Sequence, residues 1–377
     1  MQKQFIYADN AATTKLDIDA FEAMKPYLLD EYGNASQPYS FARKPKQALK
    51  EARTTIAQCI NAEPEEIFFT SGGTESDNWA IKGIAFADSE KRAIITSQIE
   101  HHAVLRACED IEKLGYPVAY LPVTKEGVIT RDALSSVITH NTRLVSVMYA
   151  NNEIGTIEPI KELCEIAHRN GALFHTDAVQ AVGHVQIDVK ELGVDILSAS
   201  AHKFNGPKGI GFLYIKKGTP IASYASGGAQ EFGMRAGTEN IASIVGMAVA
   251  LKKNCDNLAE NIKHINSIEN QLLDKLSSSG LNFVRNGSSQ HIPGNISLSF
   301  ENANGETLLH RLDLMGICVS TGAACDNVNT QTSHVLNAIG LKQEYAQGTI
   351  RVSLGIHNNN TETDVIVSAL CSVLNKN

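Results

Sequence analysis

Residues 67–79 read IFFTSGGTESDNW, a buried strand followed by two glycines, hydroxyl residues and an acidic first helical turn. Glycines let the backbone approach an anion closely, and a helix N-terminus presents free N–H groups at the positive end of its dipole. We therefore expect a phosphate site here, with Gly73 and Thr74 as contacts. An ordinary helix cap is an alternative explanation of the hydroxyl residues. The spacing matches neither a Walker loop nor a G-x-G-x-x-G dinucleotide turn.

A carboxylate closes the apolar run in LFHTDAVQ, residues 173–180. At the end of a buried strand it needs a positive partner or several hydrogen-bond donors, and a protonated pyridine nitrogen would be such a partner. Asp177, with Gln180 three residues later, is therefore a candidate for binding a pyridine ring. A plain helix N-cap is the alternative for Asp177 taken alone.

Lys203 lies in SASAHKFNGPKGIG, residues 198–211, between the end of an apolar strand and a Gly-Pro turn. A solvated surface lysine is one interpretation, and a buried amine nucleophile is the other. The second is favoured because a phosphate site, a strand-end carboxylate and a strand-end lysine are together the anchors that hold pyridoxal phosphate.

The elements that must position these residues alternate between short apolar runs and helix-like segments. This alternation is typical of an α/β fold in which helices cover both faces of a mostly parallel sheet. Most of the runs end in a polar cluster, and ligands of such sheets bind beyond the carboxyl ends of the strands. The expected strands are residues 67–70, 93–97, 118–121, 144–149, 173–176, 196–200 and 210–215.

The length of 377 residues indicates two domains or one large α/β domain with an appendage. Residues 241–277 are helical in pattern, and beyond the Gly280 turn strands and helices are mixed. We expect a large domain over residues 15–255 and a smaller α+β domain formed by residues 1–14 and 256–377.

Composition excludes several classes of protein. Lys and Arg total 33 against 41 Asp and Glu, so the formal charge of −8 gives no reason to expect nucleic acid or an anionic membrane surface. No apolar run approaches the roughly 20 residues that cross a bilayer. The N-terminal sequence lacks the features of an export signal, and the seven cysteines form no C-x-x-C pair, so we expect reduced thiols and a cytoplasmic location.

Motifs along nearly the whole chain resemble those of cysteine desulfurases of the NifS/IscS type, which are fold-type I pyridoxal-phosphate enzymes of the class V aminotransferase superfamily. In chain order the motifs are YADNAATT (7–14), SGGTESDN (71–78), EHHAV (100–104), NNEIG (151–155), HTDAVQ (175–180), SAHKFNGPKGIG (200–211), GGAQEFGMRAGTEN (227–240), STGAAC (320–325) and IRVSLG (350–355).

The resemblance implies a role for each candidate residue. Lys203 would bind pyridoxal 5'-phosphate covalently and later move the substrate Cα proton, and His101 would stack on the ring and assist proton transfer. Asp177 would bond the ring nitrogen. The other implied contacts are Gln180 and Asn152 near the phenolic oxygen, Gly73, Thr74, Ser200 and His202 at the phosphate, Thr238 reaching the phosphate from the second subunit of a homodimer, and Arg351 with Asn34 at the substrate carboxylate.

Cys325 distinguishes a desulfurase from an aminotransferase of the same superfamily, because only the desulfurase needs a nucleophile that takes the sulfur of cysteine. It precedes DNVNTQTS, a polar stretch with little periodicity that indicates a loop able to swing in and out. The resemblance implies conversion of L-cysteine to L-alanine, a persulfide on Cys325, and a sulfur-acceptor protein for iron-sulfur cluster assembly or tRNA thiolation. A selenocysteine lyase, a class V aminotransferase and a non-catalytic scaffold are the alternatives.

Departures from the family pattern concern four positions away from the cofactor anchors. Ala35 and Tyr39 stand where proline and histidine are usual, Phe232 where a basic residue is frequent, and Ile356 where arginine is common. They leave substrate entry and partner docking open. The adjacent His101 and His102 could suggest a metal, but neighbouring side chains seldom bind one ion and no third ligand is spaced nearby, so we expect none.

Overall fold

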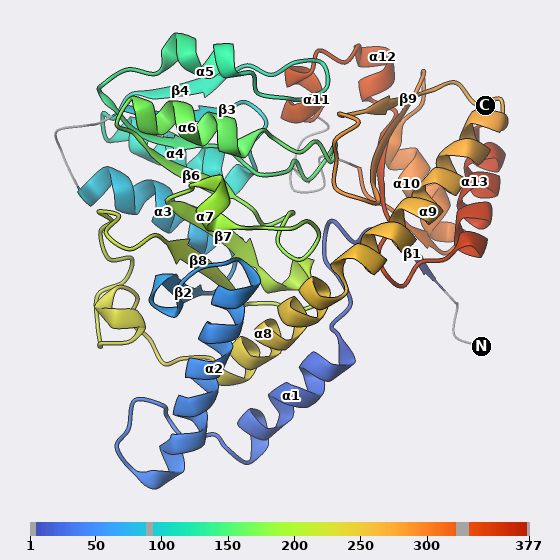
Figure 1. The fold of residues 1–377 in the computed structure, drawn as a ribbon. Coiled ribbons are helices and arrows are strands. Elements are labelled where there is room, and N and C mark those ends of the chain that lie inside the picture. The colour runs from blue at the N-terminus through green and yellow to red at the C-terminus, as the bar shows by residue number, and fades with distance from the viewer. Residues whose placement is uncertain (1–4, 88–92, 322–331, 375–377) are drawn as a thin grey trace.

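A computed structural model describes residues 5–87, 93–321 and 332–374, and a seven-stranded sheet is its largest element (Figure 1). The strand order is β2-β8-β7-β6-β5-β3-β4, with β3 to β7 parallel and β8 antiparallel to both of its neighbours. The predicted mostly parallel α/β sheet is confirmed. The strands are β2 Ile67–Thr70, β3 Ala93–Ser97, β4 Val118–Leu121, β5 Thr142–Ser146, β6 Leu173–Asp177, β7 Ile196–Ser200 and β8 Gly211–Ile215.

Neighbouring residues along these strands enter different hydrophobic cores. Phe68 and Ile196 pack in the cluster that includes α3 and α4, whereas Phe69 and Leu197 pack in the larger cluster that includes α2, α6 and α8. Side chains alternate between the faces of a strand, so a sheet covered on both faces reads as a continuous apolar run. The helices are α1 Ile18–Leu29, α2 Arg43–Cys59, α3 Gly73–Ala87, α4 His102–Lys113, α5 Arg131–Val137, α6 Ile160–Arg169, α7 Val189–Leu192 and α8 Ile241–Asp256.

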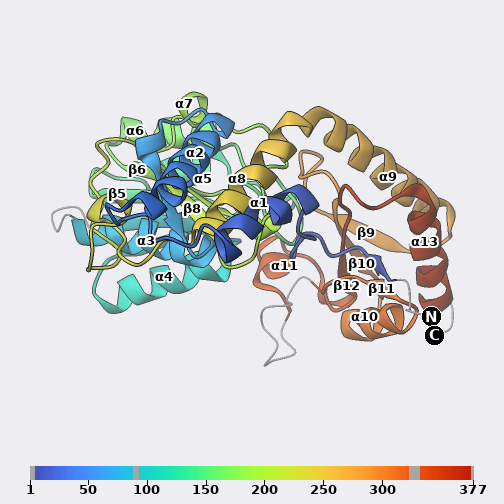
Figure 2. The same ribbon diagram turned by 90° about the horizontal axis from the view of Figure 1, so that it is seen from below.

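A second sheet lies beside the first, and α9 leads from α8 along it (Figure 2). It has the antiparallel order β12-β10-β9, and a separate hydrophobic cluster joins it to α9, α10 and α13. The N-terminal β1 pairs in parallel with β11 of this part of the chain. The elements are β1 Ile6–Tyr7, α9 Leu258–Ser278, β9 Phe283–Asn286, β10 Asn295–Phe300, α10 Gly305–Leu314, β11 Ile317–Cys318, α11 His334–Ala338, α12 Gln343–Ala346, β12 Thr349–Ser353 and α13 Asn360–Leu374.

Several expected boundaries were wrong: β5 starts at Thr142 rather than 144, β6 and β8 differ from the expected strands by one residue at one end, and two elements differ by more. The strand expected at 144–149 ends at Ser146, although the N–H groups of Val147 and Tyr149 still donate to carbonyls of β6 and its end. Val147 is buried, so the apolar run continues past the regular strand. The helical segment expected at 241–277 is two helices separated by Asn257, an interruption too short to disturb the hydrophobic pattern. Within the described residues, no helix combines the length and apolar character needed to span a bilayer.

A buried ion pair connects α2 to the segment that follows β8. The Arg53 guanidinium donates to both carboxylate oxygens of Glu231, at 2.7 and 2.8 Å, and also to the Ile67 carbonyl. Glu231 in turn accepts from the Phe69 N–H at 2.8 Å. Phe232, one of the four departures, places its ring 5.2 Å from the same guanidinium. The pair therefore fixes the start of the segment that carries Thr238.

Replacing Arg53 with alanine should lower the free energy of unfolding by about 3 kcal/mol, because Glu231 would remain buried without its cation. Urea unfolding followed by circular dichroism measures this change. Lys25→Ala, which removes an exposed pair with Glu22 on α1, is the matched control and should cost less than about 1 kcal/mol. Equal losses for the two variants would contradict the importance given to the buried pair.

Candidate active site

The three predicted anchor segments meet at one edge of the seven-stranded sheet. β6 ends at Asp177, β7 ends at Ser200, and β2 leads through Gly72 into the N-terminus of α3. A Cβ atom added to Gly72 would lie 3.5 Å from the Ser200 hydroxyl oxygen, so the glycine turn and the end of β7 face each other. The carboxyl ends of these strands thus form the concave edge where ligands of such sheets bind.

Lys203 is held by backbone carbonyls rather than by solvent. It ends a short 3-10 turn after β7, and its Nζ donates to the carbonyls of Ala11 at 2.6 Å and Ala12 at 2.8 Å. The Gln180 side-chain amide also donates to the Ala11 carbonyl, at 3.1 Å. These contacts bring the predicted Lys203 and Gln180 to the same N-terminal segment.

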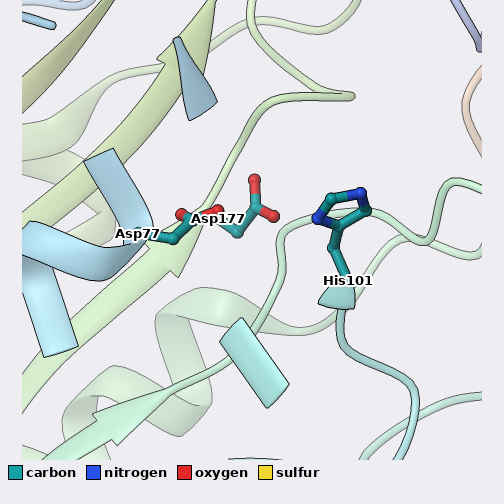
Figure 3. Close-up of side chains that lie close together, drawn as sticks. All are labelled: Asp77, His101 and Asp177. Carbon is teal, nitrogen blue, oxygen red and sulfur yellow. The ribbon is translucent and has the colours of Figure 1, made fainter. Parts of the chain in front are cut away.

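Asp177 and His101 face each other, and Asp77 lies behind Asp177 (Figure 3). Their nearest ligand atoms all lie within 4.8 Å of one another. Burial raises the pKa of Asp177 to about 6, while the Val179 N–H, which donates to it at 2.9 Å, and the charge of Lys203 oppose the rise. Asp177 therefore ionises near neutral pH.

The neighbours behind Asp177 are uncharged. Burial and then the charge of Asp177 raise the pKa of Asp77 well above its ordinary value, which favours its neutral form. Burial lowers the pKa of His175 to about 3, and its ring nitrogens lie 2.8 Å from the Ser146 hydroxyl and 3.0 Å from the Ser198 hydroxyl. The negative charge of this buried cluster is therefore concentrated on Asp177.

His101 is neutral and has a defined tautomer. It caps α4, where its Nδ1 accepts from the Ala103 N–H at 3.1 Å, so the ring proton lies on Nε2. Burial, followed by the positive charges of Lys203 and His102, lowers the pKa of His101 to about 4. A neutral imidazole beside a buried carboxylate suits stacking on an aromatic ring.

The expected phosphate contacts line the other side of the site. α3 begins at Gly73, and the N–H groups of a first helical turn are available to bind an anion. A Cβ at Gly73 would lie 2.7 Å from the Val179 side chain, so a larger residue would fill the turn. Ser200 is buried near Gly72, and His202 Nδ1 lies 3.1 Å from the Thr13 hydroxyl. This glycine turn, which leaves room for an anion, fits the phosphate of pyridoxal phosphate.

Arg351 approaches from the second sheet. It is buried on β12, and its guanidinium donates to the Asn152 carbonyl at 2.7 Å and to Asp9 at 2.8 Å. The Arg351 Nε is buried and has no hydrogen-bond partner among the described residues. A buried donor without a partner is costly, so this atom is suited to an incoming carboxylate.

The structure brings most of the predicted site residues together, but not all of them. Asn34 lies in the connection between α1 and α2, where its side chain accepts from the Ser36 N–H, and Figure 1 shows this connection at the far end of the molecule from the second sheet. Thr238 is exposed after the short turn that carries Phe232. Cys325 lies outside the described residues.

Several residues of the site carried no sequence signal of their own. The carbonyls of Ala11 and Ala12 belong to residues whose side chains do no chemistry. Asp9 and His175 stand inside motifs that we quoted, YADNAATT and HTDAVQ, yet their partners lie far away in sequence. Asp77 lies on α3 one turn after the glycines, at a position that an acidic first helical turn explains equally well.

A lysine, a carboxylate and an imidazole at the strand ends of a mostly parallel sheet define a class of enzyme that binds pyridoxal phosphate. Residues 6–366 match the family described as Aminotransferase class-V. Relatives named cysteine desulfurase IscS, from Dictyoglomus turgidum and Clostridium botulinum, are each 47% identical over 99% of this chain and 95% of their own sequences.

Solved structures agree with this assignment. A NifS-like protein is 37% identical with a TM-score of 0.93, covering 99% of this chain and all of its own. A structure described as SspA in complex with cysteine is 35% identical with a TM-score of 0.83, covering 94% of this chain and all of its own. The chain belongs to the class V aminotransferase family and, within it, to the cysteine desulfurases of the NifS/IscS type, whose cofactor is pyridoxal 5'-phosphate.

The lowered pKa of His101 predicts how stability depends on pH. An unfolded histidine binds a proton below about pH 6.5, but folded His101 does so only near pH 4. The folded cofactor-free protein should therefore lose up to about 3 kcal/mol of stability from this group as pH falls from 6.5 to 4. Urea unfolding across this range should show a shallower slope for His101→Gln. His140→Gln, at an exposed site, is the control, and an unchanged slope in the His101 variant would contradict the assignment.

Proposed function

We propose that this protein converts L-cysteine to L-alanine and transfers the sulfur to Cys325 as a persulfide. The observation that carries the proposal is the convergence of Lys203, Asp177, His101 and the buried Arg351 at one sheet edge, in a chain closely similar to proteins named cysteine desulfurases. An amine, a neutral imidazole and a carboxylate-binding cation in one site suit an α-amino acid substrate.

The chain's own residues fit the cofactor at each of its polar groups. Asp177 would bond the ring nitrogen, and because its neighbours Asp77 and His175 are uncharged, that nitrogen would be the natural counter-charge. His101 would cover the ring, Gln180 and Asn152 would lie on the phenolic-oxygen side, and Lys203 would form the covalent link. The phosphate would be held by Gly73, Thr74, Ser200 and His202.

We assign the Asp77, His101 and Asp177 cluster to the ring rather than to a metal ion. Burial raises the pKa of Asp77, which lies behind Asp177, and His101 Nδ1 already accepts from a backbone N–H. Metal ligands must be deprotonated and must face a common point.

Proton movement falls to Lys203. When bound, pyridoxal phosphate supplies an electron sink that stabilises negative charge at the substrate Cα. The Lys203 amine takes the Cα proton, and the Ala11 and Ala12 carbonyls, which accept from Nζ, stabilise the ammonium that results. His101, neutral above about pH 5, assists through its Nε2–H.

Arg351 is suited to hold the substrate carboxylate. Its free Nε and the flat guanidinium fork match the two oxygens of a carboxylate. Asp9, the present partner of this fork, must share or yield its place when substrate binds. Asn34, the second carboxylate contact implied by the resemblance, would have to come from the other subunit of a dimer.

The described residues on either side of the segment that contains Cys325 contact residues of the site. Ser320 exchanges two backbone hydrogen bonds with Arg351, and on the other side His334 contacts the Glu100 carbonyl, next to His101. This supports a thiol that reaches the substrate. The Cys325 thiolate attacks the substrate sulfur, an S–S bond forms, and the C–S bond breaks with its electron pair left on carbon, which takes a proton to give alanine.

A homodimer is part of the proposal. Exposed large apolar side chains gather on α1, on the α1–α2 connection and after β8, and a second copy could cover them. The same surface segments carry Asn34 and Thr238, both expected at an active site but exposed or distant within one chain. The apolar residues concerned are Ile18, Phe21, Leu28, Leu29, Tyr32, Tyr39, Phe41, Tyr224 and Phe232.

The proposal also includes a division into two domains, a cytoplasmic location and a sulfur-acceptor protein. Residues 15–255 would form the cofactor-binding domain, and residues 1–14 with 256–377 the smaller one, which the separate hydrophobic cluster around the second sheet supports. The six described cysteines are all free thiols, as expected in the cytoplasm. A sulfur-acceptor protein, serving iron-sulfur cluster assembly or tRNA thiolation, would take the persulfide. Neither nucleic acid nor a membrane is expected as a direct partner.

Cys325→Ala should keep the visible absorbance of bound cofactor but form no persulfide, because the sulfur has no acceptor thiol. Mass spectrometry of the protein after incubation with cysteine, together with alanine and sulfide assays, measures this outcome. Cys371→Ala, on α13, is the control and should behave like the parent. Undiminished alanine formation in the Cys325 variant would reject the role.

A keto acid in place of alanine would favour the aminotransferase alternative, a strong preference for selenocysteine would favour the lyase, and an absent cofactor band would favour a scaffold.

Arg351→Lys should raise the KM for cysteine by about 30-fold, since an ammonium cannot replace a bidentate fork and the loss of a charged hydrogen bond costs about 2 kcal/mol. The kcat should change less. Steady-state alanine formation measures both constants, and Arg131→Lys on the exposed start of α5 is the control. A fall in kcat at constant KM would place Arg351 outside the substrate contacts.

A further inference from the structure

Two cysteines outside the active site meet at the ends of two packed helices. Cys59 is the last residue of α2, and Cys255 is the next to last residue of α8. Both are half-buried free thiols, and both line a cavity of about 710 Å³. The cavity lies between these helix ends and residues 182–188, so the two thiols are open to small solutes.

The two sulfur atoms are hydrogen-bonding neighbours of unequal character. The interaction between these two thiols is the largest influence on the pKa of each, and it lowers the pKa of Cys255 and raises that of Cys59. Lys252, one turn before Cys255, favours the thiolate of either cysteine, whereas Asp256 opposes it. Lys252 thereby offsets the negative end of the α8 dipole, which disfavours an anion in a last helical turn.

Other cysteines of the same chain show what an inert thiol looks like here. Cys108 and Cys164 are fully buried in the hydrophobic clusters, and burial raises the pKa of each to about 12. They have no cysteine neighbour among their electrostatic contacts. Cys59 and Cys255 differ from them in facing a cavity and in facing each other.

We propose that Cys59 and Cys255 form an oxidisable dithiol, a modification site at which a small hydroperoxide closes a disulfide between α2 and α8. The Cys255 thiolate attacks one peroxide oxygen, the O–O bond breaks, and a sulfenic acid and water (or an alcohol) are produced. The Cys59 thiol then attacks the Cys255 sulfur, the S–OH bond breaks, and a second water leaves. Two thiols lose two electrons and two protons in total, and the peroxide is reduced.

The position of the pair gives the disulfide a structural consequence. Cys255 is two residues from Asn257, where α8 ends and the chain turns into α9 toward the second sheet. A covalent bond to α2 would fix this junction to the first sheet's helices. The dithiol therefore lies where the two sheets of the molecule are connected.

The test treats the cofactor-loaded Cys325→Ala protein with dilute hydrogen peroxide, which keeps the catalytic thiol out of the measurement. We expect a loss of two titratable thiols, a linked peptide containing Cys59 and Cys255, and reversal by dithiothreitol. When Cys59→Ser is added to this variant, dimedone, a reagent that reacts with sulfenic acids but not with thiols, should label Cys255. When Cys255→Ser is added to the Cys325→Ala protein instead, the rate at which the protein consumes peroxide should fall about tenfold, because the neutral Cys59 thiol is a poor nucleophile.

Added Cys371→Ser is the matched control, since it removes a half-buried cysteine from α13 and should leave the linked peptide unchanged. Retention of all thiols after peroxide treatment would overturn the proposal. So would a linked peptide joining other cysteines, or dimedone labelling of Cys59 in the Cys255→Ser variant at the rate seen for Cys255 in the Cys59→Ser variant.

Discussion

A lysine side chain that leaves water must find hydrogen-bond acceptors, and in this protein the carbonyls of Ala11 and Ala12 provide them for Lys203. Those carbonyls belong to a segment that has no regular structure after β1. The amine can therefore be presented at the sheet edge only if the N-terminal segment is itself fixed. The contacts that fix the N-terminal segment therefore determine the positions of most residues of the site.

The N-terminal segment is attached to both sheets. β1 pairs with β11, Asp9 bonds Arg351 of β12, and Thr14 donates to the His202 carbonyl beside the lysine. A segment held at both ends connects the substrate-binding cation of one sheet to the amine of the other. Its sequence, YADNAATT, is dominated by small residues, which lets its backbone approach both sheets closely.

Much of the fold and of the site could be predicted from the sequence, and the same physical reasons explain which contacts could not. Strands such as β2 and β7 were predicted with the correct bounds because apolar side chains on both faces give a continuous run ended by polar residues. Lys203 and Asp177 stand at such ends. The Asp9–Arg351 pair and the two carbonyls at Lys203 could not be predicted, because they depend on which distant segments the fold brings together. The break at Asn257 leaves the hydrophobic period almost unchanged.

The cost of burying charge explains why most of the titratable side chains around Asp177 are neutral. Burial disfavours the charged forms of Asp77, His175 and His101. Asp177, Lys203 and the buried Arg351 therefore carry the charge that the described part of the site must accommodate. A buried carboxylate with a pKa near 6 is poorly compensated, and a protonated ring nitrogen would lower that pKa by direct pairing. Without the cofactor, the poorly compensated Asp177 carboxylate destabilises the fold. Pairing with the ring nitrogen would remove this destabilisation, so cofactor binding and folding stability would be coupled.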